Sequence, residues 1–223
     1  MTRKLRAAAA PIVLLITISF GSTAFAQKPG GVLRTPVFNN PASMSIHEES
    51  AVLAERSMMA VFNNLVVFDQ HVPQNSMQSI VPDLASGWTW NDDGTELTFP
   101  LRQGVTWHDG KPFTAKDVAC TWDLLTGKSQ ETLRVNPRKS WYANLDRVTT
   151  NGDYEVTFHL KRPQPAFLAL LASGWSATYP CHIAPREMRQ HPIGTGPFKF
   201  VEFEPNQSIR ITRNPVYWKE DRP

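Results

Sequence analysis

The first 26 residues constrain this chain most strongly, because they decide in which compartment the rest of it folds. Arg3, Lys4 and Arg6 precede an apolar run from Ala7 to Phe20, and small residues then lead to Ala24-Phe25-Ala26. A basic start, a short apolar stretch and an A-x-A site are typical of a secretory signal peptide. We therefore predict a signal peptide over residues 1–26, cleavage after Ala26 and an exported product. A membrane anchor is the alternative, although the run is shorter than a spanning helix needs.

Removal of this segment also changes the charge of the chain. The sequence has 23 Lys and Arg against 20 Asp and Glu, and three of the basic residues lie in the predicted signal peptide. The part from Gln27 onward therefore has no net charge, and no basic excess is left to bind nucleic acid. With 41% hydrophobic and 19% charged residues, the composition is that of a globular chain and not of a disordered one.

The two cysteines, Cys120 and Cys181, would both enter an oxidising compartment. A disulfide between them is permitted there, but spacing alone does not establish one. We expect two separate buried thiols rather than a bond. A different interpretation is that Cys181 and the adjacent His182 form a hydrolase dyad, although sequence neighbours rarely meet as nucleophile and base.

Hydrophobic periodicity and turn residues predict a mixed α/β chain with many hairpin-linked strands. Thr114 and Asp117 have the spacing of a capping box before a helix that Gly127 ends. The expected helices cover 50–62, 115–125 and 165–172. The expected strands cover 32–38, 65–68, 88–90, 97–101, 105–107, 148–150, 154–160, 175–179, 198–203 and 208–212.

Tryptophan is abundant, with seven residues in the chain. Trp88, Trp90 and Trp107 fall in expected strands, and we predict that they belong to the core. Trp141 and Trp175 instead lie at loops or element ends beside small or polar residues. An aromatic side chain in such a place can form the wall of a ligand cleft, or it can fill a gap beneath its own loop. The residues themselves leave both interpretations open.

Signals for catalysis and metal binding are weak. The sequence has no G-x-S-x-G, no phosphate-binding glycine loop and no H-E-x-x-H. His108-Asp109-Gly110 is typical of a β-turn, and the remaining histidines lack the spacing of metal ligands. Gly194-Thr195-Gly196-Pro197-Phe198 indicates a turn that enters a strand. We expect no catalytic residue, no metal and no cofactor.

Several ordered motifs resemble the peptide/nickel-type extracellular solute-binding proteins of family 5, which serve ABC importers. The similarity extends from about Gly31 to Pro223. It is carried by Val81–Trp88 (VPDLASGW), Asp92–Gly94, Leu101–Val105 (LRQGV), Trp107–Val118 (WHDGKPFTAKDV), Gly194–Phe198 (GTGPF), Arg213–Pro215 and Tyr217-Trp218.

This resemblance implies a periplasmic-binding-protein-like class II fold, of mixed α+β type, in a two-lobed receptor. The first lobe would have a core subdomain at 31–46 and 167–223 and an inserted subdomain at 47–166. The ligand would lie between the lobes and be enclosed by hinge closure. The partners would be a peptide or peptide-like solute and the membrane subunits of the importer, with the receptor a periplasmic monomer that does not bind nucleic acid.

The same resemblance implies ligand-binding residues. The segments that match Ser140-Trp141-Tyr142 and Gly174-Trp175 contribute ligand contacts in relatives, which favours Trp141, Trp175 and Tyr142. The loop with Asn39 and Asn40 would face the cleft. The Gly194–Phe198 motif is interpreted as structural packing.

Relatives are about twice as long, so the sequence predicts a truncated chain that lacks the second lobe. Nickel chelates, sugars and opines therefore remain possible ligands beside peptides. Two other functions stay open: an exported Cys-His hydrolase, and a ligand-binding partner of a membrane sensor.

Overall fold

The computed structural model of the chain describes residues 30–36 and 39–219, and the predicted signal peptide lies outside them. The chain divides into two units, residues 1–36 and 37–223. In the first unit, residues 30–36 form no strand, so this part of the strand predicted at 32–38 is wrong. Gly30 and Gly31 both adopt positive φ, which interrupts an extended run where it would have to begin.

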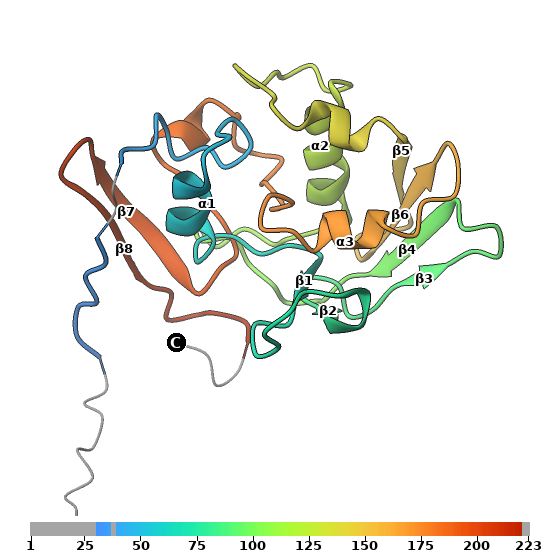
Figure 1. Cartoon of the computed structure of the whole chain (residues 1–223), viewed down its shortest axis with the longest axis horizontal. Helices are drawn as coiled ribbons and strands as arrows, with labels where there is room; N and C mark the ends of the chain where they lie inside the picture. The colour runs from blue at the N-terminus through green and yellow to red at the C-terminus, as the bar shows by residue number, and fades with distance from the viewer. Residues whose placement is uncertain (1–29, 37–38, 220–223) are drawn as a thin grey trace, which may run out of the picture. The chain divides into compact units, whose positions relative to one another are not determined.

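The second unit alternates short strands and helices (Figure 1), which confirms the mixed α/β class. No helix in the described part of the chain combines the length and apolar character that a membrane crossing requires. The helices are α1 (Val52–Met58), α2 (Ala115–Thr126) and α3 (Phe167–Leu171), with short 3-10 helices η1 (Met77–Ser79), η2 (Lys139–Tyr142) and η3 (Glu187–Arg189). The strands are β1 (Val66–Phe68), β2 (Ile80–Pro82), β3 (Thr89–Trp90), β4 (Glu96–Pro100), β5 (Leu145–Thr150), β6 (Glu155–Leu160), β7 (Phe198–Glu204) and β8 (Ser208–Arg213).

The largest sheet is antiparallel, with the strand order β3-β4-β6-β5. Leu97 and Phe99 of β4 pair with Phe158 and Val156 of β6, and all four side chains are buried. Successive residues of a strand point to opposite faces, so the alternation predicted from the sequence places one face of the sheet in the core. The hairpin predicted at the Asn151-Gly152 turn is confirmed as β5–β6.

Helix α2 packs beside β5 and β6 (Figure 1), where Trp122 meets the Phe158 ring edge-on at a centroid distance of 4.9 Å. The helix begins with the predicted capping box between Thr114 and Asp117 and ends at Gly127, which has φ 79°. Two backbone donors at its start are satisfied in this way, so its boundaries are fixed locally. Of the predicted core tryptophans, Trp107 is buried, and Trp88 and Trp90 pack against the same core.

The helix predicted at 50–62 is shorter than expected, because α1 ends at Met58. The carbonyls of Ala60 and Val61 accept hydrogen bonds from the backbone of Phe198 and Gly196, at 3.0 Å each, instead of continuing the helical ladder. The strand predicted at 175–179 is also absent. There the backbone N–H of Thr178 bonds to the Asn63 carbonyl, and that of Tyr179 bonds to the Thr121 hydroxyl.

Cys120 and Cys181 form a disulfide, with their Cα atoms 5.7 Å apart, so the expectation of two separate thiols is wrong. The backbone of Cys181 also donates to Asp117 Oδ1 at 2.8 Å, which brings its loop onto α2. A thiol in a disulfide is not available as a nucleophile. His182 does not face it either, since its Nε2 lies 2.7 Å from Asp109 Oδ2. In this structure, therefore, Cys181 and His182 do not form the dyad of the hydrolase alternative.

Candidate functional site

A groove with a volume of about 540 Å³ is a candidate site in the described part of the second unit. Its walls come from α1, from the turn at 62–64, from β1 and the loop after it, from the turn at 172–175 and from the segment after β8. Its lining combines apolar side chains, among them Phe62 and Phe68, with about as many polar ones. A concave surface that joins apolar contact area to polar groups is suited to binding a small molecule.

A chain of polar contacts forms the floor of the groove. The Thr195 hydroxyl donates to Asn63 Oδ1 at 3.1 Å, and Asn63 Nδ2 lies 3.1 Å from each carboxylate oxygen of Asp83. Asp83 is buried and also accepts from the backbone N–H of Asn64 at 3.0 Å and from the Lys219 ammonium. Buried charge of this kind persists only when it is paired and hydrogen-bonded. The floor is therefore fixed before any ligand arrives.

The two glycines of the Gly194–Phe198 motif explain how closely this segment approaches the turn that follows α1. A Cβ added at Gly194 would collide with the Val61 carbonyl, and one at Gly196 would lie 2.5 Å from the Ala60 carbonyl oxygen. Only glycine permits this approach of two backbones. The motif thus has the structural packing role predicted for it, and it aims Thr195 at Asn63.

Trp175 stands at the rim of the groove, in the turn that follows α3. The hydroxyls of Ser173 and Ser176 both donate to the Leu170 carbonyl at 2.7 Å, which fixes this turn. The Arg138 guanidinium carbon lies 4.0 Å from the centre of a Trp175 ring. Arg138 is itself buried and donates to the backbone carbonyls of Ile46 and Glu49. The guanidinium of Arg138, which these hydrogen bonds hold in place, thereby covers one face of the Trp175 indole. The rest of the Trp175 side chain is partly exposed.

Glu55 of α1 is a groove residue that sequence reasoning missed. Its carboxylate lies so close to Gly174 that a Cβ added there would collide with Oε1. Burial raises the pKa of Glu55, and the charge of Arg138 opposes that rise. The only signal in the sequence is a carboxylate beside the apolar positions Ala54 and Met58 of the helix, which does not reveal a groove.

The predicted ligand residues do not all lie together. Trp141, 43% exposed, shares Arg138 with Trp175, its ring centre lying 5.9 Å from the guanidinium carbon. Tyr142 is buried; its hydroxyl lies 3.0 Å from Ser176 Oγ, and burial raises its pKa.

Asn39 and Asn40 are exposed and lie elsewhere, where Asn40 Oδ1 accepts from the backbone of Asn206 in the β7–β8 turn. Of the predicted residues, Trp175 lines the groove; Trp141, Tyr142, Asn39 and Asn40 are not part of its wall.

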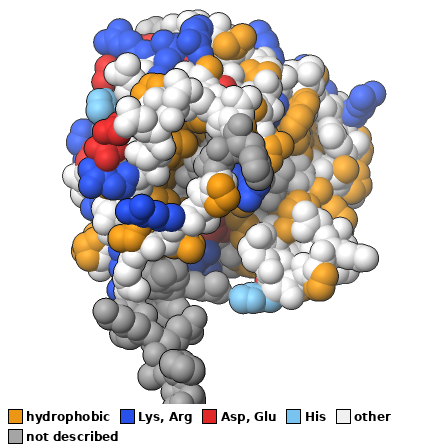
Figure 2. Space-filling model, turned by 60° about the vertical axis from the view of Figure 1, so that its left-hand side comes forward, with side chains coloured by type: hydrophobic (Ala, Val, Ile, Leu, Met, Phe, Trp, Pro, Cys, Tyr) orange, Lys and Arg blue, Asp and Glu red, His pale blue; other side chains and the backbone are white. Residues whose placement is uncertain are grey.

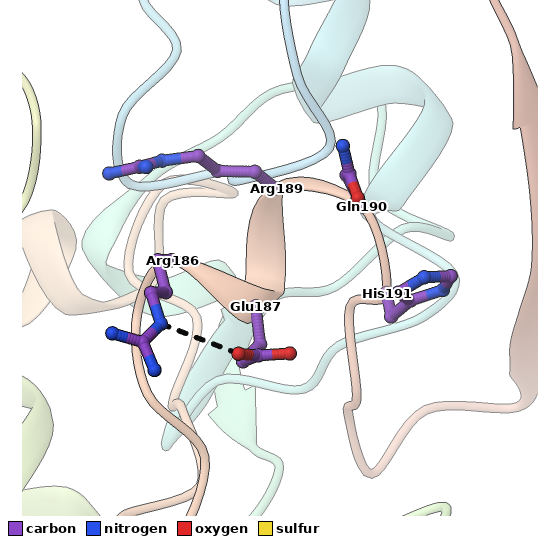
Figure 3. A pocket seen from close by; sticks show the side chains of 5 residues that line it. All are labelled: Arg186, Glu187, Arg189, Gln190 and His191. Atoms are coloured by element: carbon purple, nitrogen blue, oxygen red, sulfur yellow. Dashed lines mark hydrogen bonds and ion pairs between the residues drawn. The ribbon is translucent and has the colours of Figure 1, made fainter.

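A smaller pocket of about 270 Å³ lies at η3 (Figure 3). Its side chains spread in different directions: Arg186 pairs with Glu187, Arg189 extends away from that pair, and His191 lies on the other side. Arg189 is engaged with Glu48 at 2.7 and 2.8 Å. These groups do not converge on one point, so the groove remains the stronger candidate.

Charge on the surface is mixed. The face drawn in Figure 2 carries Lys and Arg side chains along its upper edge and on its left side, where acidic side chains also lie, and hydrophobic side chains on its right side. Within the described residues, no group of three or more His, Cys, Asp or Glu side chains is arranged to hold a metal ion.

Comparisons with known proteins agree on one family. The family model "Bacterial extracellular solute-binding proteins, family 5 Middle" matches residues 79–223. The chain is 30% identical to "Di/tripeptide-binding protein 1" of Pseudomonas aeruginosa (strain UCBPP-PA14) over 84% of the chain and 37% of that relative. It is 32% identical to "Di/tripeptide-binding protein 2" of the same strain over 63% of the chain and 30% of the relative. The chain thus spans about a third of the length of these curated relatives.

Solved structures give the same result for the fold. The periplasmic binding protein DppA from Helicobacter pylori, in complex with peptide STSA, superposes with a TM-score of 0.71 at 25% identity, over 81% of this chain and 38% of that one. The oligopeptide-binding protein AppA from Bacillus subtilis, in complex with a nonapeptide, gives 0.68 at 26% identity, over 81% and 36%. These structures share the predicted periplasmic-binding-protein fold, of which the chain covers a part.

Proposed function

The chain belongs to the family 5 bacterial extracellular solute-binding proteins, and on that premise we propose that it is part of the receptor of an ABC-type importer whose groove binds a peptide or peptide-like solute. The observation that carries this proposal is the rim of the groove. Trp175 is held there by a buried guanidinium, next to a polar floor that is already ordered. An ordered wall lowers the entropic cost of binding.

The groove acts by binding alone in this proposal. The indole of Trp175 gives apolar contact area to the ligand, and Asn63 and Asn64 hold the floor in place through hydrogen bonds to Asp83 and Ser173. Trp141 would extend the aromatic wall through its shared contact with Arg138. Tyr142 would act indirectly by holding Ser176, and Asn39 and Asn40 would contact the ligand only at a separate edge.

The proposal also includes export of the chain to the periplasm. Residues 1–26 would direct the chain to the periplasm as a cleaved signal peptide, and the Cys120–Cys181 disulfide fits an oxidising compartment. Segments 31–46 and 167–223 would form the lobe core and 47–166 its inserted subdomain. The receptor would work as a monomer that delivers its ligand to the importer's membrane subunits.

Calorimetry with di- and tripeptides tests the proposal. We expect saturable binding that Trp175→Ala weakens at least tenfold, because the variant removes the largest apolar contact of the rim. Val201→Ala on β7, 39% exposed and outside the groove lining, is the matched control and should bind as the original chain does. Equal binding by the two variants would place the ligand elsewhere.

The importer role needs a separate test in cells. Deletion of the gene should abolish uptake of the peptides that bind in calorimetry. Normal uptake together with loss of a peptide-dependent signalling response would favour the sensor-partner alternative instead.

A further inference from the structure

Three charged side chains line the groove, and two of them neutralise each other. Asp83 and Lys219 form an ion pair in the floor. Glu55, in the wall that α1 forms, is the third. The lining therefore has a net negative charge, which comes from this one carboxylate.

The Glu55 carboxylate has no bonding partner of its own among the described residues: no hydrogen bond or ion pair involves it. The charge of Arg138 acts through space to lower the pKa of Glu55, against the effect of burial. The guanidinium itself, however, donates to the carbonyls of Ile46 and Glu49 and covers the Trp175 ring. Through space, the charge of Arg138 is offset in part by Glu55 and, to a smaller extent, by Glu49. Glu55 thus has unused capacity to accept hydrogen bonds.

The position of Glu55 is fixed even though its carboxylate is unpaired. Gly174 leaves room for Oε1 directly above its Cα, and the adjacent Trp175 forms the rim. A half-buried carboxylate that lacks a partner carries a desolvation cost, which shows as a raised pKa. An ammonium group from a ligand would offset that cost with charge-assisted hydrogen bonds. An anionic group at the same place would be repelled.

We propose that Glu55 selects ligands that place an ammonium group against it, in the corner of the groove between α1 and the Gly174-Trp175 turn. This inference rests on the proposed function of the groove. The ammonium can be the amino terminus of a peptide or the end of a lysine side chain, since both present the same chemistry to the carboxylate.

Three peptides distinguish these sources by calorimetry at pH 7.5: trialanine, N-acetyl-trialanine and N-acetyl-Ala-Lys-Ala. The first has a terminal ammonium, the second has none, and the third has only a side-chain ammonium. We expect N-acetyl-trialanine to bind about tenfold more weakly than at least one of the other two. A preference for the first identifies the amino terminus, and a preference for the third identifies the side chain.

The variant Glu55→Gln keeps the shape of the side chain and removes its charge. It should reduce the tenfold preference to less than twofold while leaving the affinity for N-acetyl-trialanine within twofold. Glu187→Gln is the matched control, because it removes one negative charge from the smaller pocket at η3, outside the groove. A thermal melt checks folding, and Glu55→Gln should melt no lower than the original chain, since its charge is half-buried at a cost.

Peptide binding in the groove and the role of Glu55 are tested separately by these measurements. If none of the three peptides binds, the proposed function of the groove is overturned and the role of Glu55 with it. If the peptides bind with equal affinity, or if Glu55→Gln keeps the preference, the inference about Glu55 alone is overturned.

Discussion

Asp83 is the residue whose replacement should disturb the groove floor most. Its side chain is 2% exposed, and its carboxylate accepts from Asn63 Nδ2, from the Asn64 backbone and from the Lys219 ammonium. Asp83→Asn keeps the size but removes the charge and turns an N–H₂ group toward existing donors. Breaking a buried ion pair by changing one partner costs about 3–5 kcal/mol, because the other charge loses its compensation.

Urea unfolding measures this loss. With a denaturant slope of about 2 kcal/mol per molar, a loss of 4 kcal/mol lowers the unfolding midpoint by about 2 M. Lys219→Met is the informative comparison, since Lys219 is 28% exposed and its loss leaves Asp83 with the donors of Asn63 and Asn64. We expect about 1–2 kcal/mol for that variant. An Asp83→Asn midpoint within about 0.25 M of the original would refute the reasoning that the floor depends on this carboxylate.

Three further results follow from the packing and the buried groups. Gly194→Ala should destabilise the chain by about 1–3 kcal/mol in urea unfolding, because its Cβ meets the Val61 carbonyl, and a smaller loss would mean that the two backbones separate easily. His47 is fully buried, and burial lowers its pKa to about 3. Below pH 6.5 the unfolded state therefore binds a proton at His47 that the folded state does not bind until about pH 3. Stability should therefore be full above pH 6.5 and fall toward pH 3 by up to about 1.4 kcal/mol per pH unit, and His47→Gln should flatten that slope in pH-dependent melts. Reduction of the Cys120–Cys181 disulfide, which closes a loop with a sequence separation of 61, should cost about 2–4 kcal/mol, and an unchanged melt in reductant would show that the bond does not constrain the unfolded chain.

Local signals in the sequence predicted the elements that depend on neighbouring residues. The capping box of Thr114 and Asp117 and the left-handed Gly127 set both ends of α2. The alternation of Leu97 and Phe99 identified the buried face of β4. Each of these features is decided within a few residues, so single-sequence reasoning reaches it.

The features that were predicted wrongly or missed depend on contacts between residues that lie far apart in the sequence. Helix α1 ends early because Ala60 and Val61 give their carbonyls to a segment well over a hundred residues away. The disulfide needs Cys181 to be brought onto α2, which spacing cannot show. Glu55 becomes a groove residue only when Gly174 packs against it.

The site predictions divide in the same way. Trp141 and Trp175 became candidate ligand residues because they are aromatic residues at loops or element ends. Only the fold shows that Arg138 contacts both of them. That only Trp175 is part of the groove wall depends on the turn after α3.

The central claim is that ligand binds in the groove beside Trp175, and a nitrogen-15 NMR titration with a di- or tripeptide tests it most directly. Each tryptophan gives its own indole N–H signal, so one spectrum contains both the probe and its controls. We predict that the Trp175 indole and the Gly174 amide shift in a saturable manner, even at millimolar affinity, while the buried Trp107 and Trp122 indoles stay in place. Shifts that leave Trp175 and Gly174 unchanged up to 10 mM peptide, an affinity limit of about −3 kcal/mol, would contradict the account.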